Sequence, residues 1–92
     1  MKEKEIDAYV ADFGQALAAE LRAARARQRI TFDQLAAESG LSRSAVANYI
    51  GGYRDIPVSA LVSMSAALDT DPRAIFNAAQ DAVQDPRRPD AS

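Results

Sequence analysis

The residues of this sequence that could do chemistry are gathered in one stretch, TFDQLAAESGLSRSAVANYIGGYRDIP, which covers residues 31–57. The stretch predicts two short helices joined by a tight glycine turn. In such a pair the helices cross at nearly a right angle, and the second helix can enter the major groove of DNA. The small Ala36 lies where the two helices would touch, and Gly40 permits the turn. The apolar Leu41 follows and is expected to fill the space at that turn. The chemistry predicted here is hydrogen bonding to bases and phosphates.

The composition excludes most other kinds of site. The 92 residues include no Cys and no His, which excludes disulfides, thiolate or histidine metal sites and Ser-His-Asp triads. We therefore expect no enzyme activity, no catalytic residue, no metal and no cofactor. No apolar run approaches the roughly 18–20 residues that a membrane span needs. The amino-terminal MKEKEID is also too charged for a signal peptide, so the expected location is the cytoplasm.

The charge of the chain is unevenly distributed. The formal net charge is −2 and the sequence pI is about 4.9, which at first argues against a nucleic-acid binder. Residues 1–20 carry two Lys and five acids, and residues 55–92 carry three Arg and six acids, so each end has a net charge of −3. Residues 21–54 carry six Arg and two acids, a net charge of +4. The acidity therefore lies in the two ends, and the segment with the predicted helix pair is basic.

Apolar spacing predicts an all-α fold of five helices. Alanine, the best helix former, accounts for 20 of the residues. Apolar residues spaced by three and four predict a first helix over residues 5–28. Gly14 interrupts its apolar stripe at a cost of roughly 1 kcal/mol, which leaves open a break in the helix there. The other helices are predicted over residues 32–38, 43–50, 58–68 and 72–84.

Capping residues mark where these helices begin. Thr31 and Gln34 have the spacing of a capping box, and Ser42 is a favourable N-cap for the helix that follows. Asp71 is placed to cap the last helix, with Pro72 at its first position.

The sequence resembles the helix-turn-helix of the phage repressor and Cro family, also called the Xre family. The resemblance covers residues 13–76 and includes LRAAR at 21–25, GYRD at 52–55 and LDTDPRAIF at 68–76. It implies a compact five-helix bundle like that of lambda repressor, with an N-terminal helical extension. We expect the extension over residues 1–12, the DNA-binding domain over 13–84 and a disordered tail over 85–92. The chain would be nucleoid-associated, in the host cytoplasm if it is encoded by a phage.

The resemblance also implies roles for individual residues. In a repressor-like docking, Arg43 and Ser44 lie at the floor of the major groove, where Arg43 can pair with a guanine. Asn48 can reach an adenine or a phosphate, and Ala47 can touch a thymine methyl group. Phosphate contacts would come from the start of the helix at Thr31 and Phe32, and from the loop residues Tyr53 and Arg54.

Two positions depart from the pattern of the family. Phe32 stands where the family often has a Gln that contacts phosphate, so that contact is lost, or Phe32 packs against the first helix. Ile50 stands where the family often has a Glu that pairs with an Arg at the position of Arg25. Arg25 is then left to pair with Glu38, to face solvent or to contact DNA.

The function expected is that of a repressor that binds a near-palindromic double-stranded operator as a homodimer. The predicted dimer interface is Ile75, Phe76, Ala79 and Val83; Ile75 and Phe76 also pack on the core, and Ala79 and Val83 remain exposed. Ile6, Tyr9 and Val10 of the extension either wrap their own domain or form a second dimer surface. No small-molecule ligand is expected. The alternative is a protein-interaction module, or an antitoxin or controller protein, with weak or no direct DNA binding.

Overall fold

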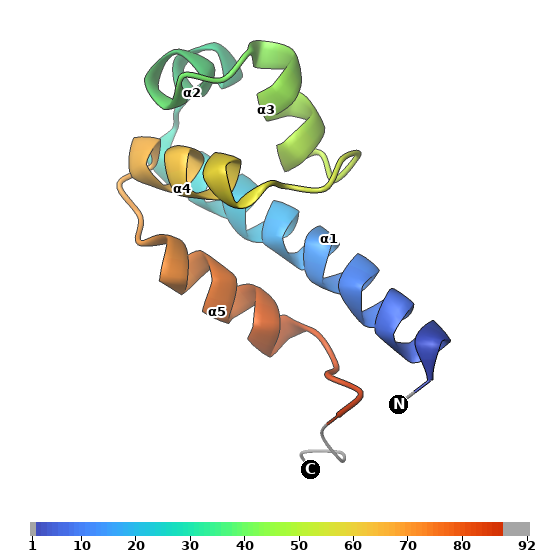
Figure 1. Ribbon diagram of the computed structural model, residues 1–92. Coiled ribbons are helices and arrows are strands. Elements are labelled where there is room, and N and C mark those ends of the chain that lie inside the picture. Colours follow the sequence, from blue (N-terminus) through green and yellow to red (C-terminus); the bar gives the residue numbers. More distant parts are fainter. Residues whose placement is uncertain (1, 88–92) are drawn as a thin grey trace.

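A computed structural model describes residues 2–87, and in that range helices are the only regular secondary structure. The five helices are α1 (Glu3–Gln28), α2 (Phe32–Ser39), α3 (Arg43–Ile50), α4 (Val58–Ala67) and α5 (Pro72–Ala82). In Figure 1, α1 runs the length of the molecule, α2 and α3 lie together at one end of it, and α5 lies along it. The predicted all-α, five-helix fold is confirmed. No helix within residues 2–87 is both long and apolar enough to cross a membrane.

α1 is one continuous helix of 26 residues, so the break considered at Gly14 does not occur. The cost of a glycine in the helix is offset by packing of the same segment on α5. The ring of Phe13 lies 4.8 Å from that of Phe76, centroid to centroid, and Tyr9 meets Phe13 edge-on at 5.9 Å. α1 ends at Gln28, and Arg29 caps it: Arg29 has a left-handed backbone (φ 54°) and donates its N–H to the carbonyl of Ala26.

The predicted caps are all present. Thr31 Oγ1 accepts a hydrogen bond from the N–H of Gln34 at 3.1 Å, and the Gln34 side chain accepts from the N–H of Thr31 at 2.8 Å. Ser42 Oγ accepts from the N–H of Ala45 at 3.0 Å. Helix ends are less well predicted than helix starts: α2 runs to Ser39, whereas α4 and α5 end one and two residues earlier than expected.

The start of α5 carries a charged cap. Asp71 accepts from the N–H of Arg73 at 2.9 Å and also binds its guanidinium at 2.8 Å. The side-chain hydrogen bond from Arg73 lowers the pKa of Asp71. Because the pKa is lowered in the folded chain, this stabilisation is present at neutral pH and is lost as the pH falls through the folded-state value.

One small core joins the helices. Its largest fully buried apolar side chains come from α1, α2, α3 and α4 and from the residue that ends α4; they are Leu21, Leu35, Val46, Ile50, Met64 and Leu68. Ile75 adds a buried side chain from α5. A short helix is not stable alone in water, so each of these helices depends on packing into the shared cluster.

Residues 85–87, the first part of the predicted tail, are described by the structure. Asp85 is buried, and its carboxylate binds the guanidinium of Arg87 at 2.6 Å, which raises the pKa of Arg87. Burial of Asp85 therefore places the first residue of the predicted tail against the domain. The remainder of the predicted tail, residues 88–92, lies outside the described residues.

Two glycine substitutions should shift stability in opposite directions. Gly40 has φ 77° and an added Cβ would meet nothing within 4 Å. The only cost of Gly40→Ala is therefore the strain of an alanine in the left-handed conformation. We expect it to lower the free energy of unfolding by about 1–2 kcal/mol. Gly14→Ala, in the middle of α1, should raise it by about 0.5–1 kcal/mol. Urea denaturation followed by circular dichroism measures both, and an unchanged or more stable Gly40→Ala chain would contradict the role assigned to the turn.

Candidate nucleic-acid interface

α3 buries one face and presents the other. Val46 and Ile50 point into the core and are almost fully buried. Arg43 and Ser44, at the start of the helix, are exposed, and Ala47 and Asn48 are partly buried. The structure thus brings the four residues predicted to read bases onto the outer side of one short helix.

An ion pair joins the starts of α2 and α3. Arg43 Nε lies 2.7 Å from Asp33 Oδ1, with both side chains largely exposed. Sequence reasoning missed Asp33 as a site residue, because a carboxylate in the first turn of a helix is expected there for its interaction with the helix dipole alone. An exposed pair of this kind contributes about 0–1 kcal/mol. It can therefore orient Arg43 and still yield to a stronger partner.

Phe32 forms the centre of an arginine–aromatic stack. The guanidinium of Arg25 lies 4.7 Å from the centroid of the Phe32 ring, and that of Arg43 lies 5.9 Å from it. Arg25 Nη1 also donates to the carbonyl of Ile30 at 2.9 Å. The sequence left alternatives open for both residues. Phe32 packs against the first helix, and Arg25 forms no ion pair with Glu38 in the described part of the chain.

The loop after α3 is fastened to α1. Arg22 Nη1 donates to the carbonyl of Ile50 at 2.6 Å, and Gln15 Nε2 donates to that of Gly52 at 2.8 Å. Gly52 has φ 78°, where a side chain would strain the backbone, and a Cβ there would lie 2.5 Å from Gln15 Oε1 and displace the Gln15 amide. These bonds fix the part of the loop that immediately precedes Tyr53.

The fastened loop presents two side chains to solvent. The backbone N–H groups of Tyr53 and Arg54 both bond to the carbonyl of Asn48, at 3.0 and 3.3 Å. Tyr53 is 82% exposed, and Arg54 is exposed as well. At the other end of the helix pair, Thr31 is exposed while its hydroxyl caps α2. Cationic, hydroxyl and amide groups therefore flank α3 on a backbone that is held in place, an arrangement suited to a polyanion.

Comparison with known proteins agrees with this geometry. A family model described as a helix-turn-helix domain matches residues 16–75. The chain belongs to the helix-turn-helix family of DNA-binding transcriptional regulators. No sequence among the curated proteins matches it.

Two solved structures are similar to this member of the helix-turn-helix family. The clp gene regulator ClgR from C. glutamicum is 25% identical, with a TM-score of 0.71 over 78% of this chain and 94% of its own. The restriction-modification controller protein C.AhdI from Aeromonas hydrophila is 32% identical, with a TM-score of 0.65 over 72% of this chain and 98% of its own. The resemblance inferred from the sequence is thereby confirmed.

The four residues predicted for a dimer interface differ in their exposure to solvent. Ile75 and Ala79 are buried, and because α1 runs along α5, the expectation that Ala79 remains exposed is wrong. Phe76 is 46% exposed and Val83 is partly buried. Of the four, only Phe76 and Val83 retain surface that a second copy could contact.

The stack on Phe32 gives a prediction about stability. Arg25→Ala removes both the cation over the ring and the donor to the Ile30 carbonyl, and should lower the free energy of unfolding by about 1–3 kcal/mol. Arg27→Ala is the matched control, because Arg27 is an exposed residue of the same helix turn and should change stability by no more than about 0.5 kcal/mol. Equal effects of the two substitutions in thermal or urea denaturation would show that the stack contributes nothing.

Proposed function

We propose that this protein is a repressor that binds a near-palindromic operator as a homodimer and places α3 in the major groove. The observation that carries the proposal is the division of α3 into a buried face, with Val46 and Ile50, and an exposed polar face that begins at Arg43. One such helix reads only a few base pairs, and a two-fold symmetric pair doubles the length of the site. Occupation of an operator beside a promoter would block the polymerase.

In this docking the residues divide into two groups. Arg43, Ser44, Ala47 and Asn48 face the bases, and Arg43 forms a bidentate pair with a guanine. Thr31 and the backbone at Phe32 contact phosphates from the start of α2, and Tyr53 and Arg54 contact them from the loop. The Asp33 carboxylate holds the Arg43 side chain over the ring of Phe32 until a guanine takes its place.

The distribution of charge supports specific rather than general binding. The basic segment 21–54 contains α2, α3 and the loop that follows, whereas both ends of the chain are acidic. Acidic ends repel phosphates, which lowers affinity for DNA of arbitrary sequence. Binding then depends on the few contacts made around Arg43.

A hollow between α4 and α5 offers a surface for the homodimer. Val58 and Val62 of α4 lie beside Pro72 and Phe76 of α5 in this hollow, and Val62 is 48% exposed. We place the dimer interface there and include in it Val83, the partly buried residue that follows α5. It uses Phe76 and Val83 from the predicted set and adds the two valines of α4, which sequence reasoning had left unassigned.

The similarity to C.AhdI supports a second candidate role, that of a restriction-modification controller protein. The two roles share the same site, and they differ in which genes the operator serves. The DNA sequence that the protein selects, mapped onto the genome, distinguishes them.

The base-reading role of Arg43 is tested by selection from a random DNA pool followed by binding measurements on the selected site. We expect a palindromic consensus, and Arg43→Ala should weaken binding to it by about 1–3 kcal/mol and relax one position of each half-site. Arg54→Ala is the matched comparison: it should weaken all sequences alike and reduce the slope of log affinity against log salt by about one. Equal losses on consensus and random DNA for Arg43→Ala would contradict base reading.

The dimer interface is tested by sedimentation equilibrium of single glutamate variants. Val62→Glu places a charge in the α4–α5 hollow and should convert the dimer to a monomer, because burial of an unpaired charge opposes association. Val10→Glu, at a 61% exposed position of α1, should leave the mass unchanged. The opposite pattern would move the interface to the N-terminal extension, which is the other surface that the sequence suggested.

A further inference from the structure

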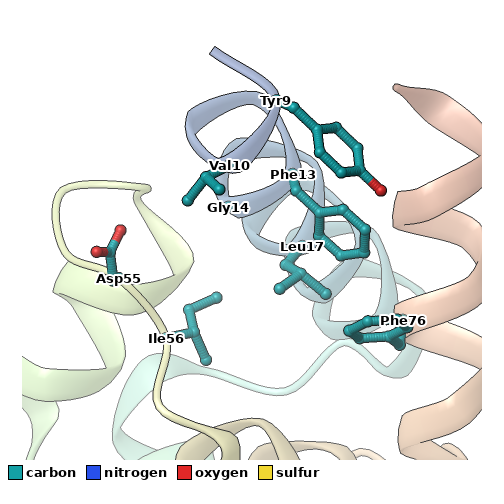
Figure 2. A pocket seen from close by; sticks show the side chains of 8 residues that line it. All are labelled: Tyr9, Val10, Phe13, Gly14, Leu17, Asp55, Ile56 and Phe76. Atoms are coloured by element: carbon teal, nitrogen blue, oxygen red, sulfur yellow. The ribbon is translucent and has the colours of Figure 1, made fainter. Parts of the chain in front are cut away.

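A second hollow adjoins the α4–α5 hollow, and Phe76 lines both. It is an apolar groove of about 490 Å³ that opens between the N-terminal half of α1, α5 and the loop before α4 (Figure 2). Tyr9, Val10, Phe13 and Gly14 of α1 precede the segment matched by the family model, and Phe76 follows it. Most of the residues that line the groove therefore lie outside the segment that the family model matches.

One side of the groove is aromatic. The ring planes of Phe13 and Phe76 are tilted by 48° with centroids 4.8 Å apart, and Tyr9 continues the row with its ring at 78° to that of Phe13. Figure 2 shows the three rings lying together on the side toward α5. Clustered ring faces and edges accept flat apolar groups, and ring faces attract cations.

The other side of the groove carries its one charged group. Among the residues that line the groove only Asp55 is ionisable to a charge at neutral pH, and it forms no hydrogen bond or ion pair with any described residue. In Figure 2 its carboxylate lies beside Gly14 and Val10, across the groove from the rings. A Cβ at Gly14 would lie 3.9 Å from Asp55 Oδ1, so the absent side chain leaves the carboxylate open toward α1.

We propose that this groove binds an amphipathic organic cation, a protonated or quaternary amine attached to an apolar body of one or two rings. The body packs on the aromatic side and the cation lies between the ring faces and the Asp55 carboxylate. A volume of this size is within the range of about 300–1,000 Å³ typical of small-molecule sites. An apolar protein surface fits less well, because it would bury the Asp55 carboxylate without a partner. The sequence predicts no such site because its walls come from three separated segments.

The groove is joined to the proposed DNA contacts. Asp55 directly follows Arg54 in the loop that Gln15 fastens to α1. A ligand that bridges Asp55 and the aromatic rows of α1 and α5 restrains that loop, and so changes the affinity for DNA. This consequence rests on the proposed function, whereas binding of the cation does not.

The test uses the full chain and naphthylmethyl-trimethylammonium as the probe, followed by two-dimensional NMR of the backbone amides. We expect saturable shifts confined to residues 9–17, 55–56 and 76. Asp55→Asn keeps the shape of the side chain and removes its charge, and should weaken binding about tenfold. Asp81→Asn, an exposed carboxylate on α5 outside the groove, should leave it unchanged. Naphthalenesulfonate, with the same rings and the opposite charge, should not bind the parent chain.

Equal affinity of the probe for the parent and Asp55→Asn chains, or shifts scattered over the surface, would overturn the proposal. The effect on DNA is measured separately with the selected operator. A change in operator affinity that is present in the parent chain and absent in Asp55→Asn supports the coupling, and no change overturns the coupling. A chain that selects no DNA refutes the proposed function, and the NMR titration still decides whether the groove binds the cation.

Discussion

The attachment of α3 and its loop to α1 is the constraint on which the rest of the site depends. α3 has only eight residues, and a helix of that length is not stable alone in water. Its inner face is held by the core, and its C-terminal end by the hydrogen bond from Arg22 to the carbonyl of Ile50. Gln15 extends the attachment to Gly52. Without α1 the outer residues of α3 would have no fixed orientation.

Local signals made most of this fold predictable from the sequence. The capping box at Thr31, the N-cap at Ser42 and the left-handed turn at Gly40 are each set by residues within four positions, so their outcome depends little on the rest of the chain. The ends of α4 and α5 were less well predicted because neither helix is followed by a glycine. α1 also lacks a glycine at its end, but it ends at the predicted residue because Arg29 adopts the left-handed conformation.

The parts of the site that sequence reasoning missed depend on contacts between helices. Arg25 of α1 contacts the Phe32 ring, and Arg43 of α3 pairs with the Asp33 carboxylate. Both partners lie on α2, so neither could be predicted from residue spacing within one helix. The assignment of Ala79 to a dimer surface failed for the same reason. An apolar stripe on α5 shows that the face is buried, but not whether α1 or a second chain buries it.

In the proposed docking, the ion pair between Arg43 and Asp33 connects the charge of the chain with its choice of DNA. On phosphate alone, Arg43 would exchange one anionic partner for another and gain little. A guanine would offer two acceptors in the plane of the guanidinium, while the DNA backbone repels the Asp33 carboxylate. Under this proposal Asp33 lowers the affinity for DNA in general, and a sequence that offers Arg43 a guanine recovers part of that loss. The negative charge beside Arg43 would then act like the acidic ends of the chain, and both would favour discrimination between sequences over strength of binding.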